Sequence, residues 1–292
     1  MSALAHMFLE KGPVTRAVVF RMGLALWTIC YWAPRVPHAA ELYARPFMRK
    51  PGPFSALVGI PYLPEWFVTG VMLLLIGCCV GFLFSRRPRR YHIVILLCIV
   101  FFHTLDGLMV RAYGAVAYTA WWLLLLVPYD QLRESDGTTR RGPLIGERLL
   151  AFHWCGIYCL TALAKLRNGE QWTSGRALWR HLHGTAQGDW LVSHWFDIPM
   201  WLCQVGAWGI IVVELAIAVA IWFPRTRRPT MVVVVLLHLS MLLTLRVSVL
   251  FPLIMWLHLC LFIRDDEWRA LQQRWNRLKH RSGRLSTSDG VV

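Results

Sequence analysis

Residues 67–84 read FVTGVMLLLIGCCVGFLF and contain no charged side chain. As a helix, these 18 residues would be about 27 Å long at 1.5 Å per residue, close to the hydrocarbon thickness of a bilayer. Residues 200–223 form a second long apolar segment, which is interrupted only by Gln204 and Glu214. The two segments predict membrane-spanning helices and therefore an integral membrane protein.

The composition of the whole chain agrees with this prediction. Hydrophobic residues occupy 57% of the 292 positions, and the mean hydropathy is +0.46. Six more spans are expected, at residues 14–32, 91–110, 115–127 and 149–166 and as two short helices within 231–263. We therefore predict an all-α fold, a polytopic transmembrane helix bundle of about eight spans.

Two regions depart from a simple series of spans. Residues 231–263 are too long for one span and contain Arg246 and Pro252, so two helices are expected to meet there. Residues 33–64 hold seven prolines and are expected to form a long loop. The bundle is predicted over residues 1–264, followed by a basic tail, 265–292, with a short surface helix and a disordered end.

The arginines and lysines predict the orientation. If the N-terminus is inside, the basic stretches 86–90, 133–148, 225–228 and 264–284 all fall on the inner side. We therefore expect a multi-pass protein of the cytoplasmic (inner) membrane with both termini inside. The formal net charge of +15 is scattered over short loops, so it indicates topology and anionic lipid rather than nucleic acid.

Ionisable side chains inside apolar helices are costly and by default mark a functional site. Lys165 ends the apolar run LTALAKL, residues 160–166. Its ammonium either reaches the interface on its four-carbon stem or loses its charge by desolvation, and only the uncharged amine accepts a proton. The other candidates are Arg21, His103, Asp106, His153, Glu214, His238, Arg246 and His258.

Several of these residues have equally plausible structural roles. His103 and Asp106 are one helix turn apart, which suits a structural pair as well as a proton relay. His153 and His258 could simply bond to backbone carbonyls, and Arg246 could reach outward from the break in the last hairpin.

Sequence motifs for nucleotide binding, serine hydrolysis and zinc-dependent hydrolysis are absent. The chain has no glycine-rich phosphate loop, no GxSxG and no HExxH motif. Its eight cysteines all lie in apolar segments. Cys155 and Cys159 have the spacing of metal ligands, but no second cluster completes a site, so no metal is expected.

The order of the polar residues resembles a known family. The matching positions are Phe20-Arg21, Leu163-Ala164-Lys165-Leu166 with Trp172 and Gly175, Val213-Glu214-Leu215, and His238 with Phe251-Pro252-Leu253. Together they resemble the membrane domain of vitamin K-dependent gamma-carboxylase and its broader relatives, the HTTM (horizontally transferred transmembrane) proteins. The resemblance extends from about residue 8 to about residue 270.

The resemblance implies a cofactor and a set of site residues. In the carboxylase, this bundle holds a reduced quinone, vitamin K, and a lysine removes its proton. Transferred to this chain, the general base is Lys165, with Glu214 and His238 as the other catalytic residues. The cofactor-binding residues expected on this basis are Arg21, His103, Asp106, Arg111 and Trp172.

Two departures limit what the resemblance implies. Residues 109–114 read MVRAYG where the carboxylase has an Asn-His pair, so quinone contacts there would have to come from Arg111 and His103. The peptide-binding lumenal domain of the carboxylase has no counterpart in these 292 residues, so this chain alone is not expected to carboxylate a protein.

Two functions therefore remain open. The first is a quinone-dependent carboxylase-like or oxidoreductase enzyme in the lipid bilayer. The second is a non-catalytic HTTM partner or maturation factor for a secreted peptide or toxin, with a separate soluble or membrane protein as its partner. A transporter is a third, weaker interpretation. The loop 167–198, rich in Trp and His, fits an interfacial aromatic belt better than a substrate lid.

Overall fold

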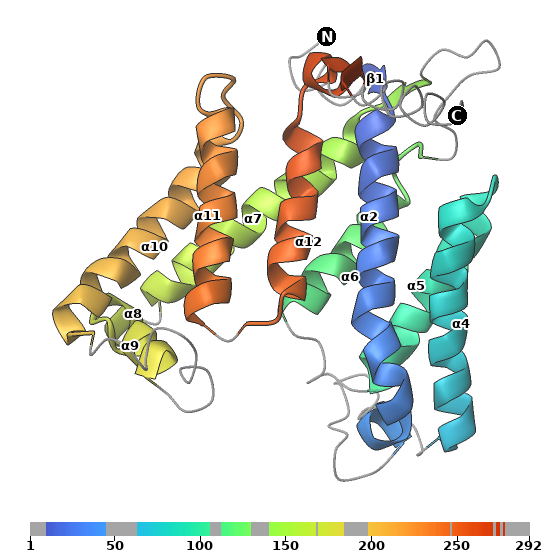
Figure 1. Ribbon diagram of the computed structural model, residues 1–292, viewed down its shortest axis with the longest axis horizontal. Coiled ribbons are helices and arrows are strands. Elements are labelled where there is room, and N and C mark those ends of the chain that lie inside the picture. Colours follow the sequence, from blue (N-terminus) through green and yellow to red (C-terminus); the bar gives the residue numbers. More distant parts are fainter. Residues whose placement is uncertain are drawn as a thin grey trace, which may run out of the picture. The chain divides into compact units, whose positions relative to one another are not determined.

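The computed structural model describes residues 10–44, 63–105, 112–129, 140–167, 169–183, 198–245 and 247–270, together with residues 273, 274 and 277. The chain divides into a large compact unit, Met1–Leu261, and a small one, Phe262–Val292. The described part of the large unit is a bundle of helices with one two-stranded sheet (Figure 1).

Within the described ranges, eight helices build the bundle. They are α2 (Thr15–Trp32), α4 (Glu65–Phe84), α5 (Pro88–Leu105), α6 (Ala112–Leu124), α7 (Ile145–Arg167), α10 (Met200–Ala220), α11 (Arg227–Thr244) and α12 (Leu250–Leu259). Among the described residues, six helices are long and apolar enough to cross a membrane, and α6 and α12 are shorter. These findings confirm the all-α polytopic bundle predicted from the sequence.

Apolar side chains cover the outside of the bundle as well as its core. In α4, Met72 and Leu75 are buried, whereas Leu73 and Phe84 on the same helix are exposed. The helix packs against α2 on one side and α5 on the other. Exposed apolar faces of this kind are favourable in hydrocarbon and unfavourable in water, which indicates a lipid environment.

Some prolines lie in the first turns of helices rather than in loops. After α2, a 3₁₀ helix (Ala33–His38) and a π-helical turn (Ala40–Ala44) occupy the start of the predicted loop. Pro34 lies in the first turn of the 3₁₀ helix and Pro252 in the first turn of α12. The amide groups of a first turn have no partner inside the helix, so proline costs little there.

A short antiparallel ladder joins two distant parts of the chain. Strand β1 (Lys11–Pro13) pairs with β2 (Arg141–Pro143), with Gly12 opposite Gly142. The sequence analysis did not predict these strands. A Cβ atom on Gly142 would lie 2.4 Å from Pro128 Cγ, so this close approach favours glycine.

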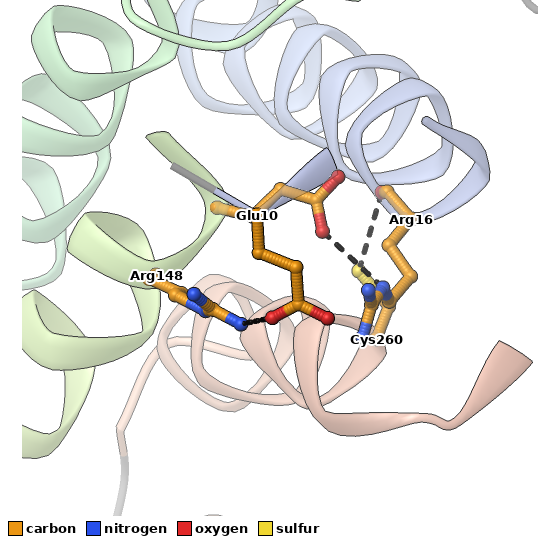
Figure 2. Close-up of polar contacts among 5 residues, drawn as sticks. Glu10, Arg16, Arg148 and Cys260 are labelled. Atoms are coloured by element: carbon orange, nitrogen blue, oxygen red, sulfur yellow. Dashed lines mark hydrogen bonds and ion pairs between the residues drawn. The ribbon is translucent and has the colours of Figure 1, made fainter. Parts of the chain in front are cut away.

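Two ion pairs and one thiol contact lie near this ladder. Arg16 Nε lies 3.2 Å from Glu147 Oε2, which joins α2 to α7, and Arg148 pairs with Glu10. The Cys260 thiol, just after α12, lies 4.0 Å from the carbonyl oxygen of Arg16. Figure 2 shows these contacts, with Arg148 beside Glu10 and Cys260 beside Arg16.

Two short helices follow α7 at the opposite end of the bundle (Figure 1). They are α8 (Gly169–Thr173) and α9 (Arg176–His183), and both pack against α10. Gly175 between them has φ = +79°, and a Cβ atom on it would lie 2.4 Å from the Gln204 amide nitrogen. The left-handed backbone and the close approach to α10 both favour glycine at this position.

Three of the basic segments on which the predicted orientation rests lie at one end of the large unit. The links from α4 to α5 and from α10 to α11, as well as β2 before α7, are at the same end as β1 (Figure 1). In the small unit, residues 265–270 are helical, and Arg264 Nη2 pairs with Asp266 Oδ2 at 2.9 Å. The end of the tail, for which disorder was predicted, lies outside the described residues.

Candidate functional site

Lys165 and Glu214 form an ion pair between α7 and α10. The lysine Nζ lies 2.6 Å from both carboxylate oxygens. The side chains are only 14% and 12% exposed. Short bonds from one ammonium to both oxygens of a carboxylate are strong, because donor and acceptor are both charged. The pair therefore fixes the last turn of α7 against the middle of α10.

Trp172 completes the surroundings of the ammonium. It comes from α8, and its ring centroid lies 5.2 Å from Lys165 Nζ, a cation–π contact. The turn at Gly175 holds α8 and α9 against α10, which keeps the tryptophan near the end of α7. Three residues singled out in the sequence are thus neighbours, although they come from three different helices.

His238 lies deeper in the bundle, on α11. It is only 2% exposed, and its Nδ1 lies 2.9 Å from the Val234 carbonyl oxygen. The ring is in edge contact with Phe251 and Tyr158, at centroid distances of 5.3 and 6.0 Å. Tyr158 is seven residues, about two helix turns, before Lys165 on α7. The histidine therefore contacts Tyr158, which lies about two turns from Lys165 on the same helix, and no direct contact of His238 with the ion pair is seen among the described residues.

Tyr158 is a site residue that the sequence analysis missed. Its side chain is buried, and its hydroxyl has no hydrogen-bond partner among the described residues. An unpaired buried hydroxyl costs free energy, so a hydrogen bond to this one would be favourable. A tyrosine in an apolar helix is common, and no sequence signal separates this one from a packing residue.

Arg21 lies in a different cluster. Its guanidinium stacks over the rings of Phe82 and Tyr129, at 5.3 and 5.9 Å. His92 joins the same cluster, since it bonds to the Tyr129 hydroxyl and to the Trp121 carbonyl oxygen, the latter at 2.9 Å. The structure therefore does not bring Arg21 together with Lys165. The sequence analysis did not identify this cluster, because its members are far apart along the chain.

His103 borders a pocket of its own. The pocket has a volume of about 230 Å³ and lies between α5 and α6. Its lining consists of Ile99, Val100, His103, Ala115, Tyr118, Thr119 and Trp122. The His103 ring is exposed and in edge contact with Tyr118, at 6.2 Å. The other two expected cofactor residues, Asp106 and Arg111, lie outside the described residues, as does Arg246.

The fold and these clusters define a polytopic α-helical membrane protein with charged side chains inside its bundle. A family model described as the HTTM domain matches residues 115–268, more than half of the chain. The chain therefore belongs to the HTTM family, as its resemblance to these proteins predicted. No curated protein and no solved structure matches the chain. The matched region contains Lys165, Trp172, Glu214 and His238, whereas Arg21 and His103 precede it.

Proposed function

We propose that this protein is a membrane enzyme that binds a reduced quinone, or a similar lipid-soluble hydroxyl compound, beside Lys165 and removes its proton. The observation that carries this proposal is the ion pair of Lys165 and Glu214, held within the bundle in the HTTM region. A charged pair at such a place is expensive to maintain and by default serves a function.

The pair can generate a free amine without adding charge to the bundle. Transfer of one proton from Lys165 Nζ to a Glu214 oxygen converts two ions into a neutral amine and a neutral acid. The amine can then accept a proton from a bound hydroxyl, which leaves the resulting oxyanion beside the lysine ammonium. Glu214 thus acts as the internal proton acceptor, and Lys165 as the base that faces the ligand.

The residues around the pair suit a quinone. The Trp172 ring offers a flat surface for stacking, and the Tyr158 hydroxyl can bond to a ring oxygen. A reduced quinone would supply the electrons of the reaction. The protein groups handle only its hydroxyl proton, and both charged side chains that do so are largely buried.

We also propose the cytoplasmic membrane as the location, with the β1 end of the bundle inside. The basic stretches 86–90, 140–148 and 225–228 belong to connections at that end. The positive-inside rule then places Lys165, α8 and α9 near the outer leaflet. A quinone dissolved in the membrane would reach the site from the lipid phase.

A second function has one observation in its favour. Lys165 and Glu214 neutralise each other's charge, so the pair could serve only to hold α7 against α10. In that case the protein would be a non-catalytic HTTM partner or maturation factor for a secreted peptide or toxin, and another protein would be its partner.

Quinone analysis of the purified protein separates the two functions. The full chain is reconstituted with membrane quinones and re-extracted in detergent, and the bound lipid is quantified by chromatography. We expect a stoichiometric quinone in the wild type and in Lys11→Met, a control at an exposed strand position. Lys165→Met should lose turnover of added quinol. A wild type that retains only bulk lipid would refute the enzyme and favour the maturation factor.

A further inference from the structure

Several buried polar atoms belong to side chains of α7 and α12 whose rings lie near one another or near His238 of α11. His153 Nδ1, Tyr158 Oη and His258 Nε2 have no hydrogen-bond partner among the described residues. The rings of His153 and His258 are 6.4 Å apart, and those of Tyr158 and His238 are 6.0 Å apart. An unpaired buried polar group is costly, so proteins normally place ordered water at such atoms.

The two histidines opposite α7 have the same orientation. His238 Nδ1 lies 2.9 Å from the Val234 carbonyl oxygen, and His258 Nδ1 lies 2.8 Å from that of Ile254. A carbonyl oxygen only accepts, so Nδ1 carries the hydrogen and Nε2 remains an acceptor. Tyr158, between them and the ion pair, can both donate and accept. Donors and acceptors are therefore available along the whole row.

Charged pairs stand at both ends of this row. Glu147 and Lys165 are 18 residues apart on α7, which is five full turns and places them on the same face. Glu147 pairs with Arg16 at one end, and Lys165 pairs with Glu214 at the other. Along the axis of α7, the steps from Glu147 through His153 and Tyr158 to Lys165 rise about 8–11 Å each. Tyr158 shares the face of Glu147 and Lys165, whereas His153 lies about 120° around the helix, with its ring 6.4 Å from that of His258. Gaps of this size require water molecules as bridges.

We propose that Glu147, His153, His258, His238 and Tyr158 form a hydrated proton pathway, here called the polar column, that connects the Lys165–Glu214 pair with the β1 end of the bundle. The Tyr158 hydroxyl accepts a proton from one water molecule and gives its own to another, whereas His238 and His258 take up a proton at Nε2 and release the same proton from Nε2 to a second water molecule, so the Nδ1 bonds to the backbone are kept. The described residues contain no group of three metal-ligating side chains, which disfavours a metal site at the two histidines.

The first test measures water at the histidines. The full chain, labelled with ¹⁵N-histidine, is placed in liposomes, and magnetisation transfer from water to each ring is recorded by solid-state NMR. Single His→Gln substitutions assign the signals. His92 is the matched control, because it is equally buried but both ring nitrogens are bonded to protein groups.

We expect fast transfer from water to His238 and His258 and slow transfer to His92. Transfer to His238 and His258 that is as slow as to His92 would mean a dry interior and would overturn the polar column.

The second test measures proton movement. Proteoliposomes that contain a pH-sensitive dye are given a potassium diffusion potential, and proton uptake is followed. Because the ion pair closes one end of the polar column, Lys165→Met should raise the uptake above that of the wild type. Adding Tyr158→Phe should return the uptake to the level of protein-free liposomes, whereas adding Tyr113→Phe, at a buried tyrosine on α6, should not.

Either of two results in the second test would overturn the polar column. One is the absence of extra uptake in Lys165→Met that is still folded by circular dichroism, and the other is uptake that Tyr158→Phe leaves unchanged. Neither test uses a quinone or an enzymatic turnover. A protein that fails to bind quinone would therefore refute the proposed enzyme without affecting the polar column.

Discussion

Removing one partner of the Lys165–Glu214 pair should destabilise the protein strongly. Lys165→Met deletes the ammonium that bonds both carboxylate oxygens at 2.6 Å and leaves Glu214 in a setting where its side chain is only 12% exposed. Breaking a buried pair on one side typically costs about 3–5 kcal/mol, and the residual exposure here suggests about 2–4 kcal/mol. Most of that cost is the unpaired carboxylate rather than the lost bond.

A double substitution separates these two contributions. In Lys165→Met with Glu214→Leu no charge remains, and the two apolar side chains can pack at the α7–α10 contact. Replacing both members of a buried pair is commonly neutral or stabilising, so we expect the double variant to recover most of the lost stability. Arg148→Met is the control, since its pair with Glu10 is more exposed and should contribute less than about 1 kcal/mol.

The assay is unfolding in mixed detergent micelles, followed by circular dichroism, with the free energy of unfolding compared among the four proteins. The reasoning fails if Lys165→Met is no less stable than Arg148→Met, because the pair would then not be formed in the membrane. It also fails if the double variant is as unstable as Lys165→Met. A stable double variant without quinol turnover would further separate the chemical role of the pair from its bracing role.

Three further predictions concern stability. Gly175→Ala should lower the free energy of unfolding by at least about 1–2 kcal/mol because of the positive φ of Gly175. Gly156→Ala should be neutral or slightly stabilising, because no atom lies within 4 Å of the added Cβ. Equal melting temperatures for the two variants would contradict this prediction. His92→Leu removes the bonds to the Tyr129 hydroxyl and to the Trp121 carbonyl oxygen and should cost about 1–3 kcal/mol in detergent unfolding, whereas Tyr91→Phe nearby should not. Glu147→Gln, at a 5% exposed side chain paired with Arg16, should lower stability more than Glu10→Gln at 44%, and a reversed order would show that burial does not govern these pairs.

The sequence predicted the helices well because the length and hydropathy of each span are local properties of the sequence. The uncharged run 67–84 and the segment 200–223 required only length and hydropathy, and α4 and α10 begin and end within a few residues of those limits. The exception depends on packing against a distant segment. The 3₁₀ and π turns after Trp32 form in spite of the prolines because the chain packs there, with Trp32 and Tyr43 against Phe102.

The site was only partly predictable, because contacts between helices are not local. Lys165, Glu214 and Trp172 were named from the sequence, and they are neighbours in the structure. Arg21 was assigned to the same site, but its partners Phe82 and Tyr129 come from segments 61 and 108 positions later. The Tyr158 hydroxyl has no hydrogen-bond partner among the described residues because the side chains opposite it on other helices do not offer one, and the sequence of α7 alone cannot predict those side chains.

The pairing of β1 with β2 restricts how the chain threads the bilayer. Residues that share a ladder must be on the same side of the membrane, so the chain between Pro13 and Arg141 has to cross it an even number of times. Among the described helices of this stretch, α2, α4 and α5 are each long enough to cross. Among the described helices between the two strands, α6 is the remaining candidate for a fourth crossing, although its 13 residues would not identify it as one by length. The three-residue ladder thus restricts the number of membrane crossings to an even number, which hydropathy alone does not determine.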